Sequence, residues 1–223
     1  MPGGTPKSLS GRSWRPPPTT LQLRIALLGI RPPIWRRVLV PSDGSGEYLH
    51  QVIQVAMGWQ ESHMHHFILG KRPELILVEH PDMLDDPMFP AREEPNTLDS
   101  TQITIDELLR KGGGRVLYEY DFGDGWMHTV TLEKELPKDS KMAVPQCLDG
   151  KRACPPEDCG GAGGYDEIVR TVKDPKFKPE GRSREELLEW LGGEYDPELF
   201  EVDEVNKQFR PPRKSPKKKS RKS

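Results

Sequence analysis

Acidic side chains occur close together at two places in this 223-residue chain. Asp121 and Asp124 flank a Gly-containing turn, and Glu157 and Asp158 follow a pair of prolines. Carboxylates grouped in this way can bind a hard divalent cation and help to activate water for hydrolysis. These four residues are therefore candidate catalytic groups. The alternative is that each carboxylate only accepts hydrogen bonds from backbone N–H groups in its own turn.

Imidazole and thiol groups add a second set of candidate ligands. His63 and His65 are separated by one residue, a spacing that places both rings on the same side of a strand. Such a pair can bind one metal, although histidines also pack and form hydrogen bonds without one. Three cysteines supply one ligand fewer than the four of a structural zinc site, so a histidine would have to complete it. The predicted zinc ligands come from His63, His65, His128, Cys147, Cys154 and Cys159; the alternative is that these residues belong to the core.

The elements around these residues indicate how they could meet. Apolar and polar residues alternate over residues 116–120 and again over 128–132, a period typical of half-buried strands. The Gly-Asp-Gly sequence between them predicts a β-hairpin with Asp121, Asp124 and His128 near its tip. The cysteines lie in a Pro- and Gly-rich segment that we expect to be a loop. We predict that this loop and His63-x-His65 converge on the hairpin tip.

The rest of the chain alternates between predicted strands and helices. Ser45 and Gly58 cap a predicted amphipathic helix, and Thr104 and Ser183 begin capping boxes of two more. Asp196-Pro197 predicts the start of the last helix. In the second strand we expect a core Trp35 beside solvated arginines at positions 36 and 37. Strands are predicted at residues 21–27, 34–40, 63–69 and 75–78, and helices near 46–57, 105–111, 165–172 and 184–191. The fold class is α+β: one compact domain, mostly an antiparallel sheet packed against several helices, with long loops.

Composition sets the domain boundaries. With 34% hydrophobic residues, 21 Gly and 23 Pro, the chain can bury one sizeable core and must carry long loops. We expect a disordered tail at residues 1–19, one domain at 20–209, an insertion within it at 72–96, and a disordered basic tail at 210–223. No segment has the roughly 18 apolar residues of a membrane span, and the N-terminus lacks a signal-peptide pattern. The sequence therefore predicts a cytoplasmic protein that has no membrane partner.

Charge is divided unevenly along the chain. The segment 210–223 carries eight Lys and Arg and no acid, whereas residues 20–209 carry 22 basic and 35 acidic residues, a net charge of −13. The tail Arg210–Ser223 could contact nucleic acid without sequence choice, or it could simply be a solvated charged segment. The acidic body argues against a DNA-binding surface on the fold. The sequence contains no Gly-x-Ser-x-Gly elbow, and Tyr165-Asp166 stands where a phosphate loop needs Lys-Ser or Lys-Thr.

Several segments together resemble one known family. They are Ile34–Arg37, Leu49–Trp59, His63–Phe67, Tyr120–His128, Pro155–Gly161 with Gly164-Tyr165, and Phe200 after Asp196-Pro197. In these segments, and over about residues 21–209, the chain is similar to the plasmid open-reading-frame-3-like family. Members are often labelled the TnpR passenger protein of an insertion element. The resemblance implies a compact α+β domain, and it implies no settled activity.

The TnpR label suggests a resolvase, and the residues do not support that activity. No histidine is followed three positions later by arginine, as a tyrosine recombinase would require, and no serine follows the first strand as in a serine resolvase. We therefore expect a non-enzymatic binding or regulatory domain associated with plasmids or mobile elements and possessing a metal-stabilised loop. Its partner would be an unknown protein or ligand at the surface made by the hairpin and the cysteine loop. The alternative is a metal-dependent hydrolase in which histidines bind the metal and a carboxylate is ligand or general base.

Overall fold

The computed structural model describes residues 18–71, 74–84, 96–139 and 143–209. The predicted C-terminal tail, nearly all of the predicted N-terminal tail, and the greater part of the predicted insertion lie outside these ranges. The strands are β1 (Thr20–Leu27), β2 (Trp35–Pro41), β3 (His65–Leu69), β4 (Ile76–Glu79), β5 (Thr97–Asp99), β6 (Arg115–Tyr120), β7 (Trp126–Leu136) and β8 (Gln146–Lys151). The helices are α1 (Gly46–Met57), α2 (Pro81–Leu84), α3 (Ile105–Lys111), α4 (Gly161–Lys173), α5 (Arg184–Trp190) and α6 (Val202–Gln208).

In the described ranges the strands form a single sheet in the order β5-β4-β3-β6-β7-β1-β2-β8. All neighbours are antiparallel except β4 and β5, so the predicted α+β class with a mostly antiparallel sheet is confirmed. β1 lies inside the sheet, and its alternate residues Leu21, Leu23 and Ile25 are almost completely buried on one face. None of the helices in the described ranges is long and apolar enough to cross a membrane.

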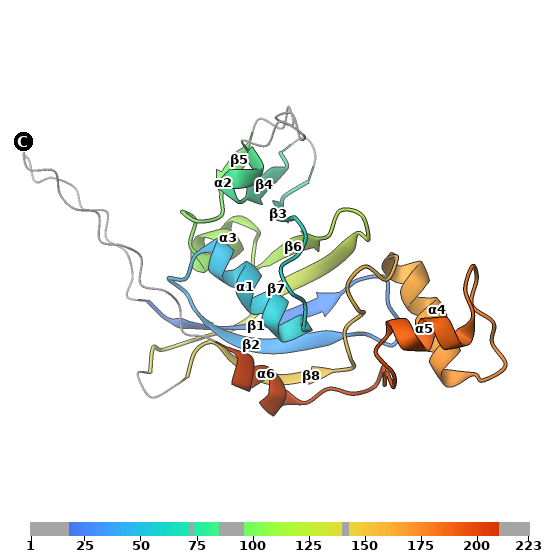
Figure 1. Cartoon of the computed structure of the whole chain (residues 1–223). Coiled ribbons are helices and arrows are strands. Elements are labelled where there is room, and N and C mark those ends of the chain that lie inside the picture. Colours follow the sequence, from blue (N-terminus) through green and yellow to red (C-terminus); the bar gives the residue numbers. More distant parts are fainter. Residues whose placement is uncertain (1–17, 72–73, 85–95, 140–142, 210–223) are drawn as a thin grey trace, which may run out of the picture.

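Helix α1 covers the face of the sheet that carries these apolar side chains (Figure 1). It begins after Ser45, whose side chain accepts a hydrogen bond from the N–H of Tyr48, and it ends at Gly58 in the left-handed conformation. Leu49 and Ile53, one turn apart, are fully buried against the sheet. The predicted caps and the predicted buried face of this helix are both confirmed.

The hairpin of β6 and β7 is also present as predicted. Tyr118 lies opposite His128, and Tyr120 lies opposite Trp126. The strands join through the turn at residues 121–125, and this tip lies beside the segment that leads from β8 into α4 (Figure 1). The hairpin and the cysteine-bearing segment are therefore neighbours in the fold.

Two local predictions were wrong. Cys147 lies on strand β8 rather than in a loop. The side chain of Asn206 in α6 makes two hydrogen bonds to the backbone of Cys147, accepting from its N–H at 2.8 Å and donating to its carbonyl at 3.0 Å. The last helix begins at Val202 rather than at Pro197. Asp196 accepts a hydrogen bond from the N–H of Glu198 and forms a turn there, because a short Asp side chain can stabilise a turn as readily as a helix start.

The prediction of solvated arginines in β2 was also wrong at one position. Arg36 is only 2% exposed, and its guanidinium lies 4.0 Å from the centre of the Phe200 ring. Trp35 is instead half-buried. Burial of the charge is offset by hydrogen bonds to backbone carbonyls, which engage four of the five N–H donors. The accepting oxygens belong to Trp35, Ala56, Lys151 and Arg152.

Candidate metal centre

The turn at the hairpin tip is organised by Asp121. This residue has a left-handed backbone (φ 56°), a conformation that Asp tolerates better than most residues, and its carbonyl accepts a hydrogen bond from Gly125. Its Oδ1 accepts hydrogen bonds from the N–H groups of Gly123 (2.9 Å) and Asp124 (3.2 Å). The other carboxylate oxygen, Oδ2, lies 3.7 Å from Nε2 of His63. One half of the carboxylate holds the turn, as the alternative interpretation expected, and the other half faces a histidine.

Glu157 is held in place by two segments of the chain. Its Oε1 accepts hydrogen bonds from the N–H of Gln60 (2.8 Å) and from the hydroxyl of Tyr120 (3.0 Å). The Tyr120 hydroxyl also accepts a hydrogen bond from the N–H of Ser62 (3.1 Å). Burial and the neighbouring carboxylate of Glu157 raise the pKa of Tyr120 well above its usual value, so this hydroxyl stays protonated and donates. Gln60 and Tyr120 are positioning groups that the sequence did not single out. Gln60 acts through its backbone N–H, which leaves no signal in a sequence, and Tyr120 fits the alternation of a strand.

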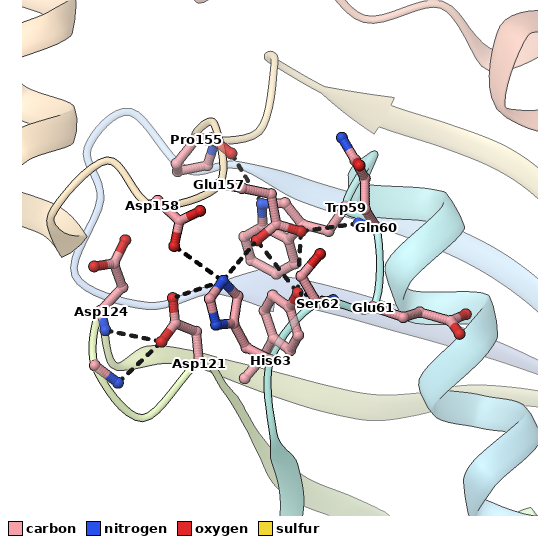
Figure 2. Close-up of polar contacts among 12 residues, drawn as sticks. Trp59, Gln60, Glu61, Ser62, His63, Asp121, Asp124, Pro155, Glu157 and Asp158 are labelled. Atoms are coloured by element: carbon pink, nitrogen blue, oxygen red, sulfur yellow. Dashed lines mark hydrogen bonds and ion pairs between the residues drawn. The ribbon is translucent and has the colours of Figure 1, made fainter.

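His63 lies at the centre of this group (Figure 2). Its Nε2 is 3.0 Å from Oδ1 of Asp158, 3.7 Å from Oδ2 of Asp121 and 3.8 Å from Oε2 of Glu157. Yet the Nε2 atom is shielded from solvent and makes no hydrogen bond. Its neighbours are ion-pair partners only, and buried polar atoms almost always form a hydrogen bond, so a shielded nitrogen that forms none among three carboxylates is a candidate ligand.

The donor set suits a divalent cation. Cations bound by imidazole nitrogen and carboxylate oxygen lie about 2.0–2.2 Å from each ligand, which places neighbouring ligand atoms about 3 Å apart. Oδ1 of Asp158 and Nε2 of His63 already have this separation, and Oδ2 of Asp121 and Oε2 of Glu157 lie within 1 Å of it when measured from Nε2. One ligand atom each of His63, Asp121 and Asp158 lies within 4.8 Å of the others, whereas Glu157 is outside this set and would have to move toward them to bind the same ion. Three carboxylates gathered around one imidazole bring like charges together, and a cation bound among them would offset their repulsion.

Asp124, the fourth predicted carboxylate, has a different role. Its Oδ2 accepts a hydrogen bond from the N–H of Gly160 at 3.1 Å, and its own carbonyl lies against the backbone of Gly161. Asp124 therefore ties the hairpin tip to the start of α4 and does not face His63. The predicted convergence of the hairpin with the loop around residues 157–161 is present in the structure.

The structure places the other two predicted histidine ligands elsewhere. The ring of His65 stacks on the ring of His50, with centroids 3.5 Å apart and planes inclined by 4°. His128 is completely buried, with its Nδ1 3.0 Å from the carbonyl oxygen of Trp126 and its ring edge-on to Trp59. Burial lowers the pKa of His128 to about 4. Neither ring belongs to the group around His63.

The cysteines do not assemble with histidines into a ligand set. Within the described ranges, the groups of three or more ligand atoms lying within 4.8 Å of one another contain no thiol. Burial raises the pKa of Cys159 to about 12 and also raises the pKa values of Cys147 and Cys154, so these side chains are thiols at neutral pH in the metal-free protein. The structure thus favours the interpretation of the cysteines as core residues.

The part of the chain that contains this site also matches a known family. Residues 19–204 match the family described as plasmid pRiA4b ORF-3-like protein. The chain belongs to this family. The match contains every strand and all helices of the described chain up to the middle of α6, and it includes all four residues of the His63 group.

Two relatives show how widely the family extends. An uncharacterised protein of Sinorhizobium fredii, y4hQ, is 30% identical over 191 residues, which cover 85% of this chain and 90% of that protein. The crystal structure of MM3350, a protein of unknown function from Methanosarcina mazei, has a TM-score of 0.69 and 33% identity, and the similarity covers 84% of this chain and 98% of that one. Related chains thus occur in a bacterium and an archaeon, and neither of the two proteins is named for an activity.

Proposed function

We propose that this plasmid pRiA4b ORF-3-like protein is a binding domain that a divalent cation stabilises at His63, Asp121, Glu157 and Asp158. The observation that supports the proposal most is the shielded Nε2 of His63, which lies close to three carboxylates and forms no hydrogen bond. These ligands come from three segments that are far apart in the sequence. A bound cation would hold together the segment just before β3, the hairpin tip and the loop before α4.

The same geometry supports a second candidate function, a metal-dependent hydrolase. The side chain of Asp158 is 70% exposed, and that of His63 is 28% exposed, so solvent reaches this side of the group. Catalytic metal sites keep one position open for water or substrate, whereas structural sites are closed by protein ligands. In this function His63, Asp121 and Glu157 would hold the metal, and Asp158 would act as ligand or general base.

Metal binding can be tested directly on the full chain. We expect chelator-treated protein to bind added Mn²⁺ or Zn²⁺ in calorimetry and to melt at a higher temperature with the ion, since a ligand that binds only the folded state stabilises it. His63→Ala should abolish this binding, and Asp121→Asn should weaken it at least tenfold. His80→Ala, which removes a half-exposed histidine outside this group, is the matched control. Equal binding by His63→Ala and the wild type would overturn the proposal.

The hydrolase is distinguished from the binding domain by a separate measurement. We expect Asp158→Asn to reduce hydrolysis of an activated ester or phosphate ester far more than it reduces metal affinity if Asp158 is the base. Absence of metal-dependent hydrolysis by the metal-loaded wild type would exclude these reactions and leave the binding domain.

We also propose a cytoplasmic location and an association with plasmids or mobile elements, the latter supported by the resemblance and by the plasmid origin in the family's name. The basic segment 210–223, outside the described residues, would contact nucleic acid through charge alone. A chain ending at residue 209 should then lose salt-dependent binding to DNA of any sequence. Unchanged binding by the shortened chain would exclude this role for the tail.

A further inference from the structure

A second group of ligand atoms lies between helix α1 and strand β3. Glu47 and His50 are three residues apart on α1, so their side chains share one face of the helix. His65 on β3 stacks against His50, and its Nε2 lies 3.6 Å from Oε2 of Glu47. One ligand atom from each of the three residues lies within 4.8 Å of the others. The Glu-x-x-His spacing is visible in the sequence, and it was not part of the predicted site.

His65 has an unsatisfied buried nitrogen. Its side chain is 6% exposed, and Nε2 is shielded from solvent without a hydrogen bond. Glu47 is the carboxylate that this nitrogen faces, but at 3.6 Å the two atoms are too far apart for a hydrogen bond. The two atoms are within ion-pair distance, and a cation bound to both would give this nitrogen the close partner that it lacks.

Hydrogen bonds from neighbouring residues hold these side chains in place, as they commonly do for metal ligands. Nδ1 of His50 is 2.8 Å from the hydroxyl of Tyr118, which also accepts a hydrogen bond from Gln54 at 3.0 Å. The direction of the His50–Tyr118 hydrogen bond depends on the tautomer of His50. Metal binding through Nε2 would require the tautomer in which Nδ1 carries the proton and donates to Tyr118. The Ser100 hydroxyl donates to Oε2 of Glu47 at 3.1 Å.

We propose that Glu47, His50 and His65 form a second metal site, which takes a divalent transition-metal ion through two imidazoles and one carboxylate. This ligand set is typical of zinc and non-haem iron sites in which further positions stay open. One ligand atom of each ring lies within 4.8 Å of the other, although the rings are stacked with their planes inclined by only 4°. Nitrogen lone pairs lie in the ring planes and those planes are nearly parallel, so metal binding should tilt the rings and open the stack. The half-buried side chain of Glu47, 22% exposed, provides the route of entry.

This site differs from the His63 group in both residues and ligand chemistry. It has two nitrogens and one oxygen, whereas the His63 group has one nitrogen and three oxygens. The ring of Tyr120 contacts a histidine of each group, with centroids 5.8 Å from His63 and 6.4 Å from His50. The two groups are therefore neighbours across one tyrosine, and each can be removed without substituting a ligand of the other.

Co²⁺ titration followed by absorption spectroscopy tests the second site. We expect one equivalent to give visible bands without the near-ultraviolet thiolate absorption that a cysteine ligand would add. Glu47→Gln keeps the shape of the side chain and its contact with Ser100, and it should raise the Kd of this ion at least tenfold. His50→Asn should also raise the Kd of this ion at least tenfold. His63→Ala is the matched control and should leave these bands unchanged while it removes binding at the other site.

The stoichiometry decides between the two proposals. Equilibrium dialysis of the folded variants should give two ions per wild-type chain, one for Glu47→Gln and one for His63→Ala. If Glu47→Gln, with a circular dichroism spectrum like that of the wild type, binds Co²⁺ as tightly and in the same amount, the second site does not exist. If one ion binds and only Glu47→Gln removes it, the second site stands and the His63 site fails.

Discussion

A Cβ atom on residue 161 would lie 2.6 Å from the carbonyl oxygen of Asp124, so Gly161 allows the loop before α4 to meet the hairpin backbone directly. Gly161 also has a φ of 67°, which strains any other residue. We predict that Gly161→Ala lowers the free energy of unfolding by about 2 kcal/mol in urea titration. It should also weaken divalent-cation binding, because a displaced loop moves Asp158 away from His63.

Gly163 provides the matched control for this substitution. It lies two residues further along the same helix, and a Cβ atom there would have no neighbour within 4 Å. Gly163→Ala should leave stability unchanged or raise it by up to about 1 kcal/mol, because Ala favours the helix. Equal losses in both variants would mean that the contact with Asp124 is not the cause.

Adjacent arginines in β2 should differ sharply in their importance. Arg36→Leu leaves buried carbonyl oxygens without donors, and we expect it to lower the free energy of unfolding by about 3 kcal/mol or more. Arg37 is 30% exposed and pairs with Glu133 at 2.6 Å, so Arg37→Leu should cost less than about 1 kcal/mol. Urea denaturation of both variants measures the difference. Similar losses would show that the buried hydrogen bonds of Arg36 do not dominate its contribution.

Acid should destabilise the metal-free protein through His128. Its pKa is about 4 in the folded chain and about 6.5 when unfolded, so between these values the unfolded state binds more protons. The stabilisation is fully present above pH 6.5 and is lost as the pH falls toward 4. His50, whose pKa burial lowers to about 3, acts in the same direction. His128→Gln should therefore reduce the slope of unfolding free energy against pH by up to about 1.4 kcal/mol per pH unit, and an unchanged slope would contradict this assignment.

The thiols should be unreactive while the protein is folded. Because burial raises the pKa of Cys159 to about 12 and also raises that of Cys154, little nucleophilic thiolate is present at pH 8. We expect iodoacetamide to modify the folded chain at least tenfold more slowly than the chain in urea. Cys154→Ala should bind as much metal as the wild type. Loss of one bound ion in that variant would restore the cysteines as ligands.

The sequence predicted most of the fold because regular elements bury one face. Alternation of Leu21, Leu23 and Ile25 identified β1, and caps at Ser45 and Gly58 bounded α1, since both signals are local. The burial of Arg36 was not predictable in this way. Its partners include carbonyls more than 100 residues away, and a charged residue in a strand ordinarily faces solvent.

The site was predicted only in part for a related reason. The convergence of His63 with Asp121 and Asp158 followed from the hairpin and the loop. The expectation that His65 would join them assumed that strand alternation extends back to His63, but β3 begins at His65, and residue 63 precedes it. His65 lies in the strand and faces α1, where its ring stacks on that of His50. Which neighbour a strand residue meets depends on how distant elements pack, and local spacing does not contain that information.

Asn206 gives the open edge of the sheet a partner. Among the strands that the structure describes, β8 pairs only with β2, so its other edge would present free N–H and carbonyl groups. Asn206 bonds both of these groups on Cys147 just as a residue in a neighbouring strand would. Helix α6 therefore occupies the place where a second copy of the chain could add a strand. A protein shortened before residue 202 would carry an edge open to such pairing, and its first defect should be self-association and aggregation rather than unfolding.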